Sequence, residues 1–169
     1  MTASSSGSII KMEKRIGLGE DLHRYEKGIP LIIAGVKVPY EKGLAGHSDG
    51  DIVFHAVSDA ILSALGLRDI GYYFPPSEES IKGIDSRKIL EFAKSKIDEE
   101  GYSIENLALV IHAQEPKLSP YIDAFKESLA QTLKIETKRI GITCKTGEGL
   151  GPIGLKEAAS CRAIILLEE

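Results

Sequence analysis

Apolar and polar residues recur with two different periods along this chain of 169 residues, and these periods predict helices and strands. After HSDGD at 47–51, apolar residues recur at helical spacing and predict a helix with one buried face. This stripe consists of Ile52, Val53, Ala56, Val57, Ala60, Ile61, Ala64 and Leu65. A second helix is predicted from about Asp85 to Glu100, and a third from Ser119-Pro120 to about Leu133.

Largely apolar segments predict the strands. We expect strands at 14–23, 106–114, 139–145 and 161–167, and a short hairpin formed by 31–33 and 36–38. The two prolines of FPPSEES predict a loop. Because strands and helices alternate through the middle of the chain, we expect the α/β or α+β class, with helices packed on a sheet. Length and the lack of a repeat or linker predict one domain over 12–169.

The bulk properties restrict location and partners. The first eleven residues, MTASSSGSIIK, lack the features of a secretory signal and are interpreted as a disordered tail or cloning remnant, with Met12 as the natural start. A net charge of −4 without a basic run argues against nucleic acid as a partner, and no apolar stretch is long enough to predict a membrane span. Cys144 and Cys161 lie in apolar stretches and predict buried free thiols in a reducing compartment. We expect the bacterial cytoplasm, with an organelle stroma as the alternative.

An Asp-x-His pair, Asp21 and His23, follows the start of the first predicted strand. In an extended chain both side chains point to one face, where a metal ion and a plain aspartate–histidine hydrogen bond are the alternatives. His55, beside the stripe of the first helix, offers a third donor. One oxygen and two nitrogen donors with an open position are typical of catalytic zinc. Asp51 or Asp59 is the expected partner of the other His55 nitrogen.

Two further segments are candidates for anion binding. His47 and Ser48 precede the first helix, whose N–H groups favour an anion, while capping of the helix by Ser48 or Asp49 is the simpler interpretation. KTGEGLGPIG at 145–154 matches the dinucleotide-binding glycine pattern only formally, because no βαβ unit and no acidic residue about 20 positions onward accompany it. Such a loop can still bring backbone close to phosphates, or it is plainly flexible.

In this order, the motifs resemble the 2-C-methyl-D-erythritol 2,4-cyclodiphosphate synthase family of the non-mevalonate isoprenoid pathway. The resemblance covers residues 15–167 and is carried by the Asp-x-His pair, PYEKGLAGHSDGD, the helix with His55, LRDIGYYFP, KGIDSR, AQEPKLSP and the Thr-x-Glu loop. It implies a homotrimer with active sites between subunits, and a mixed sheet with helices on one face. It also implies a phosphorus–oxygen lyase that converts 4-diphosphocytidyl-2-C-methyl-D-erythritol 2-phosphate to the cyclic diphosphate and CMP.

The resemblance also implies roles for single residues. The expected zinc ligands are Asp21, His23 and His55. The expected ligand of Mg²⁺ or Mn²⁺ is Glu148, together with the substrate diphosphate. His47 and Thr146 are the expected catalytic residues. The residues expected to contact substrate are Asp21, Leu22, His23, His47, Ser48, Asp69, Ile70, Gly71, Phe74, Pro75, Pro76, Ser77, Glu78, Ala113, Gln114, Glu115, Pro116, Lys117, Leu118, Ser119, Lys145, Thr146, Gly147 and Glu148. Of these, 113–119 correspond to the cytidine pocket of the adjoining subunit, and 69–71 with 74–78 face the methylerythritol unit.

The chain departs from the family pattern at three substrate-loop positions. Lys145 and Gly147 stand where threonines are common, and Pro76 stands where an aspartate is common, so side-chain contacts there are open. Two other classes also remain as alternatives. One is a zinc phosphodiesterase or hydrolase that activates water, and the other is a non-catalytic nucleotide-binding trimer. The intact ligand and threonine positions argue against the second.

The trimer axis is a further point of comparison. In several members of the family that this chain resembles, an isoprenoid diphosphate binds in an apolar channel at this axis. Two phenylalanines, an arginine and a glutamate bind it. The matching positions here are Glu20, Pro152, Leu155 and Glu157, so only the glutamate is kept. Three Glu20 carboxylates near the axis would also disfavour an anion. We expect this chain not to bind isoprenoid diphosphates at that position.

Overall fold

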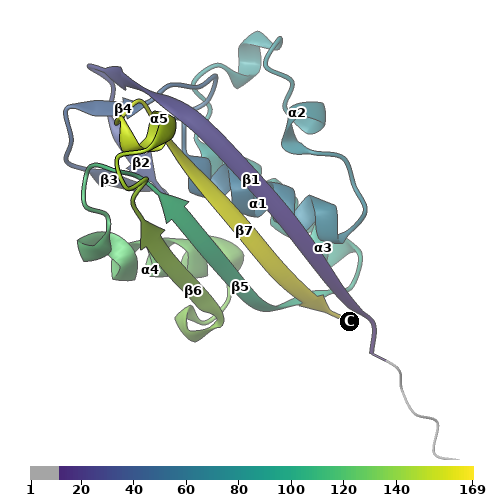
Figure 1. Ribbon diagram of the computed structural model, residues 1–169. Coiled ribbons are helices and arrows are strands. Elements are labelled where there is room, and N and C mark those ends of the chain that lie inside the picture. Colours follow the sequence, from purple (N-terminus) through teal and green to yellow (C-terminus); the bar gives the residue numbers. More distant parts are fainter. Residues whose placement is uncertain (1–11) are drawn as a thin grey trace, which may run out of the picture.

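A five-stranded mixed sheet forms one layer of the molecule, and the long helices cover one of its faces (Figure 1). The computed structural model describes residues 12–169, so the predicted tail at 1–11 lies outside the described part. The strand order is β4 (Lys42–Leu44), β1 (Lys14–Lys27), β7 (Ala158–Glu168), β5 (Ser103–His112) and β6 (Ile140–Lys145). Only β5 and β6 pair in parallel, which confirms the expected fold class.

The long helices begin and end close to the predicted positions. They are α1 (Ile52–Ala64), α3 (Ser86–Glu99) and α4 (Ile122–Leu133). The third begins three residues after Ser119, because 119–121 forms a 3-10 turn in which Ser119 makes no capping bond. The predicted hairpin is confirmed as β2 (Leu31–Ile33) and β3 (Val36–Val38). No helix of the described residues is long and apolar enough to cross a membrane.

Several short elements carried no sequence signal. They are β4, the one-turn helices α2 (Ile70–Tyr73) and α5 (Gly151–Gly154), and 3-10 turns at Glu79–Ile81 and Thr137–Arg139. The α5 turn lies within the formal glycine pattern and is followed by β7, so the rejection of a dinucleotide-binding βαβ unit is confirmed. β1 runs four residues beyond its predicted end because Tyr25, Glu26 and Lys27 pair with β4.

Helix α1 lies directly on strand β1. A side chain at Gly17 or Gly19 would collide with the backbone carbonyl oxygens of Ala60 and Ala56, respectively. Glycine on the strand and alanine on the helix therefore permit a backbone approach that larger residues would prevent. This approach brings the beginning of α1, which carries His55, beside the part of β1 that carries Asp21 and His23.

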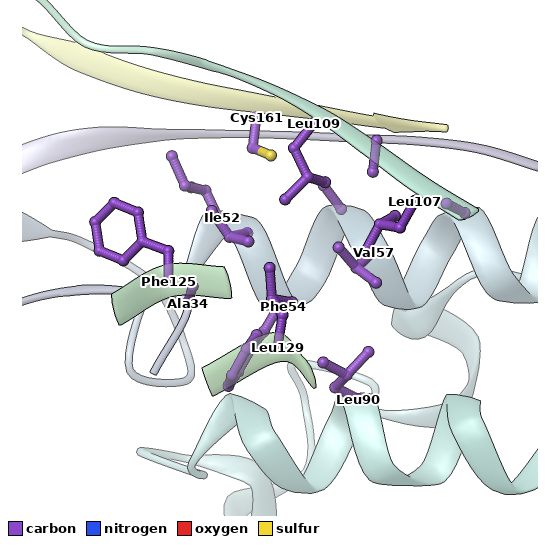
Figure 2. Close-up of a cluster of buried hydrophobic side chains, with 14 of the residues drawn as sticks. Ala34, Ile52, Phe54, Val57, Leu90, Leu107, Leu109, Phe125, Leu129 and Cys161 are labelled. Atoms are coloured by element: carbon purple, nitrogen blue, oxygen red, sulfur yellow. The ribbon is translucent and has the colours of Figure 1, made fainter. Parts of the chain in front are cut away.

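The core fills the space between the sheet and the helices. Figure 2 shows one cluster in which α1 contributes Ile52, Phe54 and Val57, the sheet Leu107, Leu109 and Cys161, α3 Leu90, and α4 Phe125 and Leu129. Each large apolar side chain buried in this way contributes roughly 1.5–3 kcal/mol. Cys161 is buried as predicted, whereas Cys144 is only half-buried, and both are free thiols. The core therefore fixes α1 against the sheet, and with it the side chains at its beginning.

The opposite face of the sheet remains apolar and exposed in the single chain. Ile16, Leu18 and Leu22 of β1 are 73%, 53% and 61% exposed, and Ile164 of β7 is 49% exposed. Glu20 lies on the same face and forms an ion pair with Arg162, with nitrogen–oxygen distances of 3.0–3.2 Å. Because side chains alternate along a strand, these residues point away from the helices.

Candidate metal and phosphate site

The Asp-x-His pair and the helix histidine meet on the helix-covered face of the sheet. Asp21 and His23 lie two residues apart on β1, and His55 lies on the first turn of α1. Their donor atoms all lie within 4.8 Å of one another, and this is the one such group of three or more among residues 12–169. The predicted convergence of these side chains is confirmed.

The geometry fits a cation better than a hydrogen bond alone. Asp21 Oδ2 lies 3.0 Å from His23 Nδ1 and 2.9 Å from His55 Nδ1. His23 Nδ1 is buried, yet within the described chain it has no correctly oriented hydrogen-bond partner, despite its distance from Asp21. A buried polar atom without a partner costs free energy, so His23 Nδ1 is suited to bind a cation at this place. Two imidazoles and one carboxylate form a donor set suited to zinc.

The charges of this group are mutually stabilised. Burial by itself would raise the pKa of Asp21, but the neighbouring His23 and His55 imidazoles, the second through a hydrogen bond, hold that pKa below its usual value. Burial would lower the pKa of His55, but Asp21, with smaller contributions from Asp51 and Asp49, raises it. The carboxylate is therefore ionised, as a metal ligand must be.

The other nitrogen of His55 does not bond to the predicted partner. Ser86 Oγ lies 2.8 Å and Ser48 Oγ 3.0 Å from His55 Nε2, so the prediction of Asp51 or Asp59 is wrong. Asp59 accepts a bond from Ile70 N at 2.8 Å. Residues spaced along one helix face do not determine the hydrogen-bond partner of the His55 ring when another element packs closer to that ring. Here that element is the start of α3.

Asp51 is instead the N-cap of α1. Its carboxylate accepts bonds from the backbone N–H groups of Val53 and Phe54, and from those of Ala34 and Gly35 in the β2–β3 turn. The expectation that Ser48 or Asp49 caps α1 is therefore wrong. Burial raises the pKa of Asp51 to about 6, against the lowering effect of these N–H groups.

A cavity of about 170 Å³ opens beside the metal-ligand group. Its lining comprises Asp21, His23, His47, Ser48, His55, Ile70, Gly71, Phe74, Pro76, Ile81 and Ile89. A neighbouring hollow of about 470 Å³ includes His47, Ser48, Pro76, Ser77 and Glu78, so most of the predicted methylerythritol loop borders one of the two. Pro75 borders neither.

Leu22 and Asp69 are predicted substrate residues that, like Pro75, lie apart from this cavity. The Leu22 side chain points to the opposite, exposed face of the sheet, as the alternation of β1 requires. Asp69 caps α2 by accepting a bond from Tyr72 N, and its side chain is not part of the lining. Any contact of Leu22 with a ligand in the cavity would have to come from its backbone.

A second cavity, of about 360 Å³, lies at the ends of β5 and β6. It is lined by Ala113, Gln114, Lys117, Leu118, Ser119, Cys144, Lys145 and Thr146. Gln114 Oε1 accepts bonds from Gly147 N at 3.2 Å and Gly149 N at 3.4 Å, which connects the two predicted substrate loops. Thr146 Oγ1 donates to Glu148 Oε1 at 2.8 Å, so the predicted threonine and metal carboxylate are neighbours.

The remaining residues of this region lie at its border. Glu115 is exposed, pairs with Lys156 at 2.7 Å, and accepts a bond from the Tyr25 hydroxyl at its carbonyl oxygen. Neither Glu115 nor Pro116 lines the cavity. Lys156 and Glu157 lie in the turn between α5 and β7 rather than on a strand.

Within one chain the two cavities are separate. Their linings share no residue. Asp21, Cys161, Ile111 and Cys144 form one row across four neighbouring strands. Three strand spacings put Asp21 and Cys144 about 14 Å apart. The metal-ligand group and the Thr146 loop of the same chain therefore border different cavities.

Sequence reasoning missed several residues that line the cavities or contact the His55 ring. Ser86 contacts His55 from 31 positions away, and Ile81 and Ile89 come from the same region. The KGIDSR motif, one of the segments that carry the family resemblance, was the only sequence feature near these residues that indicated a functional role. Cys144 borders the second cavity because it precedes Lys145 on β6, although it had been expected to be fully buried.

Comparison with known proteins identifies the family. The family model described as the YgbB family matches residues 14–168. A Synechococcus protein called 2-C-methyl-D-erythritol 2,4-cyclodiphosphate synthase is 47% identical over 155 residues, which is 92% of this chain and 99% of the relative. A solved synthase structure of the same name, described as a bound form with CDP, has a TM-score of 0.84 and 40% identity, covering 90% of this chain and 99% of that one.

A longer relative contains the same fold as one part. The bifunctional IspDF of Campylobacter jejuni has a TM-score of 0.90 and 36% identity, and the match covers 94% of this chain but 43% of that protein. The fold, the converging Asp-His-His group and the match over residues 14–168 agree, and the chain belongs to the YgbB family.

Proposed function

We propose that this chain converts 4-diphosphocytidyl-2-C-methyl-D-erythritol 2-phosphate to 2-C-methyl-D-erythritol 2,4-cyclodiphosphate and CMP. The observation that carries the proposal is the Asp21, His23 and His55 group on a cavity wall, in a chain that matches its relatives over nearly their full length. The reaction is a metal-dependent intramolecular phosphoryl transfer, catalysed by a phosphorus–oxygen lyase.

The chemistry requires two anions to meet. An oxygen of the 2-phosphate forms a bond to the β-phosphorus, the bond from that phosphorus to the CMP oxygen breaks, and CMP leaves with the electron pair. At a separation of roughly 4 Å, each pair of unit charges repels by about 1 kcal/mol in water and about 4 kcal/mol at an effective dielectric constant of 20. When bound, zinc on Asp21, His23 and His55 and Mg²⁺ or Mn²⁺ on Glu148 supply charge that offsets this repulsion.

The side chains of the protein position the substrate. His47 and Ser48 border the cavity beside the metal ligands, so both are suited to donate hydrogen bonds to phosphate oxygens. The Thr146 hydroxyl lies beside Glu148 and would donate to oxygens that gain charge in the transition state. No side chain has to act as a nucleophile, because the substrate contains one. Positioning and charge compensation are the main catalytic contributions, as in other phosphoryl transfers.

The cytidine end of the substrate fits the second cavity. This cavity has a partly apolar wall and two cations, Lys145 and, in the loop that corresponds to the cytidine pocket, Lys117. A related structure is described as a CDP-bound form, which supports a cytidine nucleotide as the ligand here. Because the two cavities of one chain are separate, the substrate must span two subunits, and the exposed apolar face of β1 and β7 is suited to the contact. We therefore propose a homotrimer with active sites between subunits.

Incubation with the diphosphocytidyl substrate, Zn²⁺ and Mg²⁺ tests the function. We expect ³¹P NMR to show the cyclic diphosphate and CMP in equal amounts, and we expect His55→Ala to abolish their formation without changing the circular dichroism spectrum. A linear product would identify a hydrolase instead. Unchanged substrate with intact nucleotide binding would identify a non-catalytic binding protein.

A further inference from the structure

The hydrogen bonds of His55 decide which of its nitrogens is free to bind a metal. Nδ1 faces Asp21 at 2.9 Å, and Nε2 faces the hydroxyls of Ser86 at 2.8 Å and Ser48 at 3.0 Å. A neutral imidazole carries one proton, and only the nitrogen without it can coordinate a cation. Without a metal, Nδ1–H donates to the Asp21 carboxylate, and a metal on the Asp21 side takes the place of that proton. His55 can therefore bind such a metal only when Nε2 carries the remaining proton.

A serine hydroxyl by itself would not select this tautomer, because it can donate to Nε2 or accept from it. Asp49 removes the ambiguity at Ser86. Asp49 Oδ1 accepts a hydrogen bond from Ser86 Oγ, and Asp49 Oδ2 accepts the Ser86 backbone N–H at 3.1 Å. A carboxylate only accepts, so the single hydroxyl proton of Ser86 points to Asp49. The Ser86 oxygen is then left to accept the Nε2 proton of His55.

The surroundings hold this chain of groups in place. Ser86 is 0% exposed and is the first residue of α3. Asp49 lies in the segment before α1, where its backbone N–H donates to Ile84 O at 3.2 Å and its Oδ1 accepts from Asp51 N at 3.2 Å. Backbone contacts thereby hold Asp49 in place, and bulk water does not reach Ser86.

We propose that Ser86, oriented by Asp49, fixes His55 with its proton on Nε2 and so prepares Nδ1 as a metal donor. Both are positioning residues, since they act through His55 and do not line the cavity beside the metal-ligand group. The assignment rests on the proposed function, because that function calls for a metal at this group. It also leaves the Ser48 hydroxyl, which borders the cavity, free to donate to a phosphate oxygen.

Zinc affinity of the full-length, metal-free protein tests the proposal separately from turnover. We expect Ser86→Ala to weaken Zn²⁺ binding by about 10- to 100-fold in competition with a chromophoric chelator. Ser58→Ala is the matched control, because Ser58 is also buried and donates to Phe54 O at 2.7 Å, away from the His55 ring. We expect this control to keep wild-type zinc affinity.

A second variant covers the case in which Ser86→Ala does not fold. Asp49→Asn keeps the shape but lets an amide N–H donate to Ser86, which turns the serine proton toward Nε2. We expect a loss of zinc affinity of about 10-fold.

Wild-type affinity in the folded variants, or an equal loss in Ser58→Ala, would overturn the proposal. If the variants lose zinc affinity as expected but the wild type forms no cyclic product, the proposed function fails and the role of Ser86 stands. If it forms the product and the variants keep their zinc affinity, only the role of Ser86 fails.

Discussion

Glu148 has a backbone conformation that few residues with side chains adopt. Its φ is +52°, in the left-handed region, which costs roughly 1–2 kcal/mol for a residue with a side chain. Glycine stands on both sides of it and would accept this conformation at a lower cost. The retained carboxylate, held by the Thr146 hydroxyl, is consistent with a role in binding a cation.

At the residue scale we predict that Glu148→Gln makes catalysis more dependent on Mg²⁺. One carboxylate is too few ligands for tight Mg²⁺ binding, so most of the binding must come from the substrate diphosphate. We expect turnover at low Mg²⁺ to fall about 10-fold or more and to recover partly as Mg²⁺ is raised, measured by CMP release across a Mg²⁺ titration. Glu127→Gln, on the exposed face of α4, is the control. Tight stoichiometric Mg²⁺ in the substrate-free wild type would contradict this prediction.

The convergence of Asp21, His23 and His55 could be predicted because local geometry largely decides it. Asp21 and His23 share one face of a strand, and the place of His55 beside the apolar stripe of the first helix predicted it as the third donor. The partners of the ligands could not be predicted. Ser86 reaches His55 only because α3 packs beside the start of α1, and Asp51 turns toward the backbone of the β2–β3 hairpin. Such contacts depend on tertiary packing, which neither periodicity nor spacing records.

The start of α1 is an element-scale feature in which one carboxylate connects two segments. Asp51 is 0% exposed and accepts N–H groups both from its own helix and from the turn at Ala34 and Gly35. The side chain of an ordinary exposed N-cap accepts hydrogen bonds only from N–H groups of its own helix. Its loss here would leave buried donors unsatisfied at two places.

We therefore predict that Asp51→Ala lowers the free energy of unfolding by roughly 2–4 kcal/mol, in urea titrations followed by circular dichroism. Asp85→Ala is the matched control, since Asp85 is the exposed N-cap of α3 and accepts only Arg87 N. It should lose about 1 kcal/mol. Equal losses in the two variants would show that the bonds to the hairpin contribute nothing.

Long helices were predictable and strand order was not. α1 and α3 follow continuous apolar stripes, whereas β4 and α5 are too short to form a pattern. The last strand, β7, inserts between β1 and β5, so the sheet is completed by the end of the chain. Such pairing depends on contacts between residues far apart in sequence, such as Asp21 with Cys161.

At the scale of the whole molecule, the separate cavities predict complementation between subunits. In a cyclic trimer with sites between subunits, co-expressed His55→Ala and Thr146→Ala chains form some sites with both halves intact. Each mixed trimer then has one intact site of three, so trimers that contain both chains should show about one third of wild-type turnover, although each variant alone is inactive. The measurement is turnover of differently tagged chains purified through both tags in turn, with the trimer checked by sedimentation.

Co-expression of two differently tagged His55→Ala chains is the control and should remain inactive. Mixed trimers that remain inactive would contradict sites shared between subunits. A monomer in sedimentation would contradict the assembly itself, and would leave the exposed apolar face of β1 and β7 unexplained.

The contact of α1 with β1 at Gly17 and Gly19 has a consequence for engineering. The distance from His55 to Asp21 and His23 is set by two positions that have no side chain and lie outside the metal-ligand group. Grafting the three ligands onto another strand and helix would fail wherever the host carries larger residues at the crossing. A transplanted site must therefore include the glycine and alanine positions as a spacer, even though none of them touches the ion.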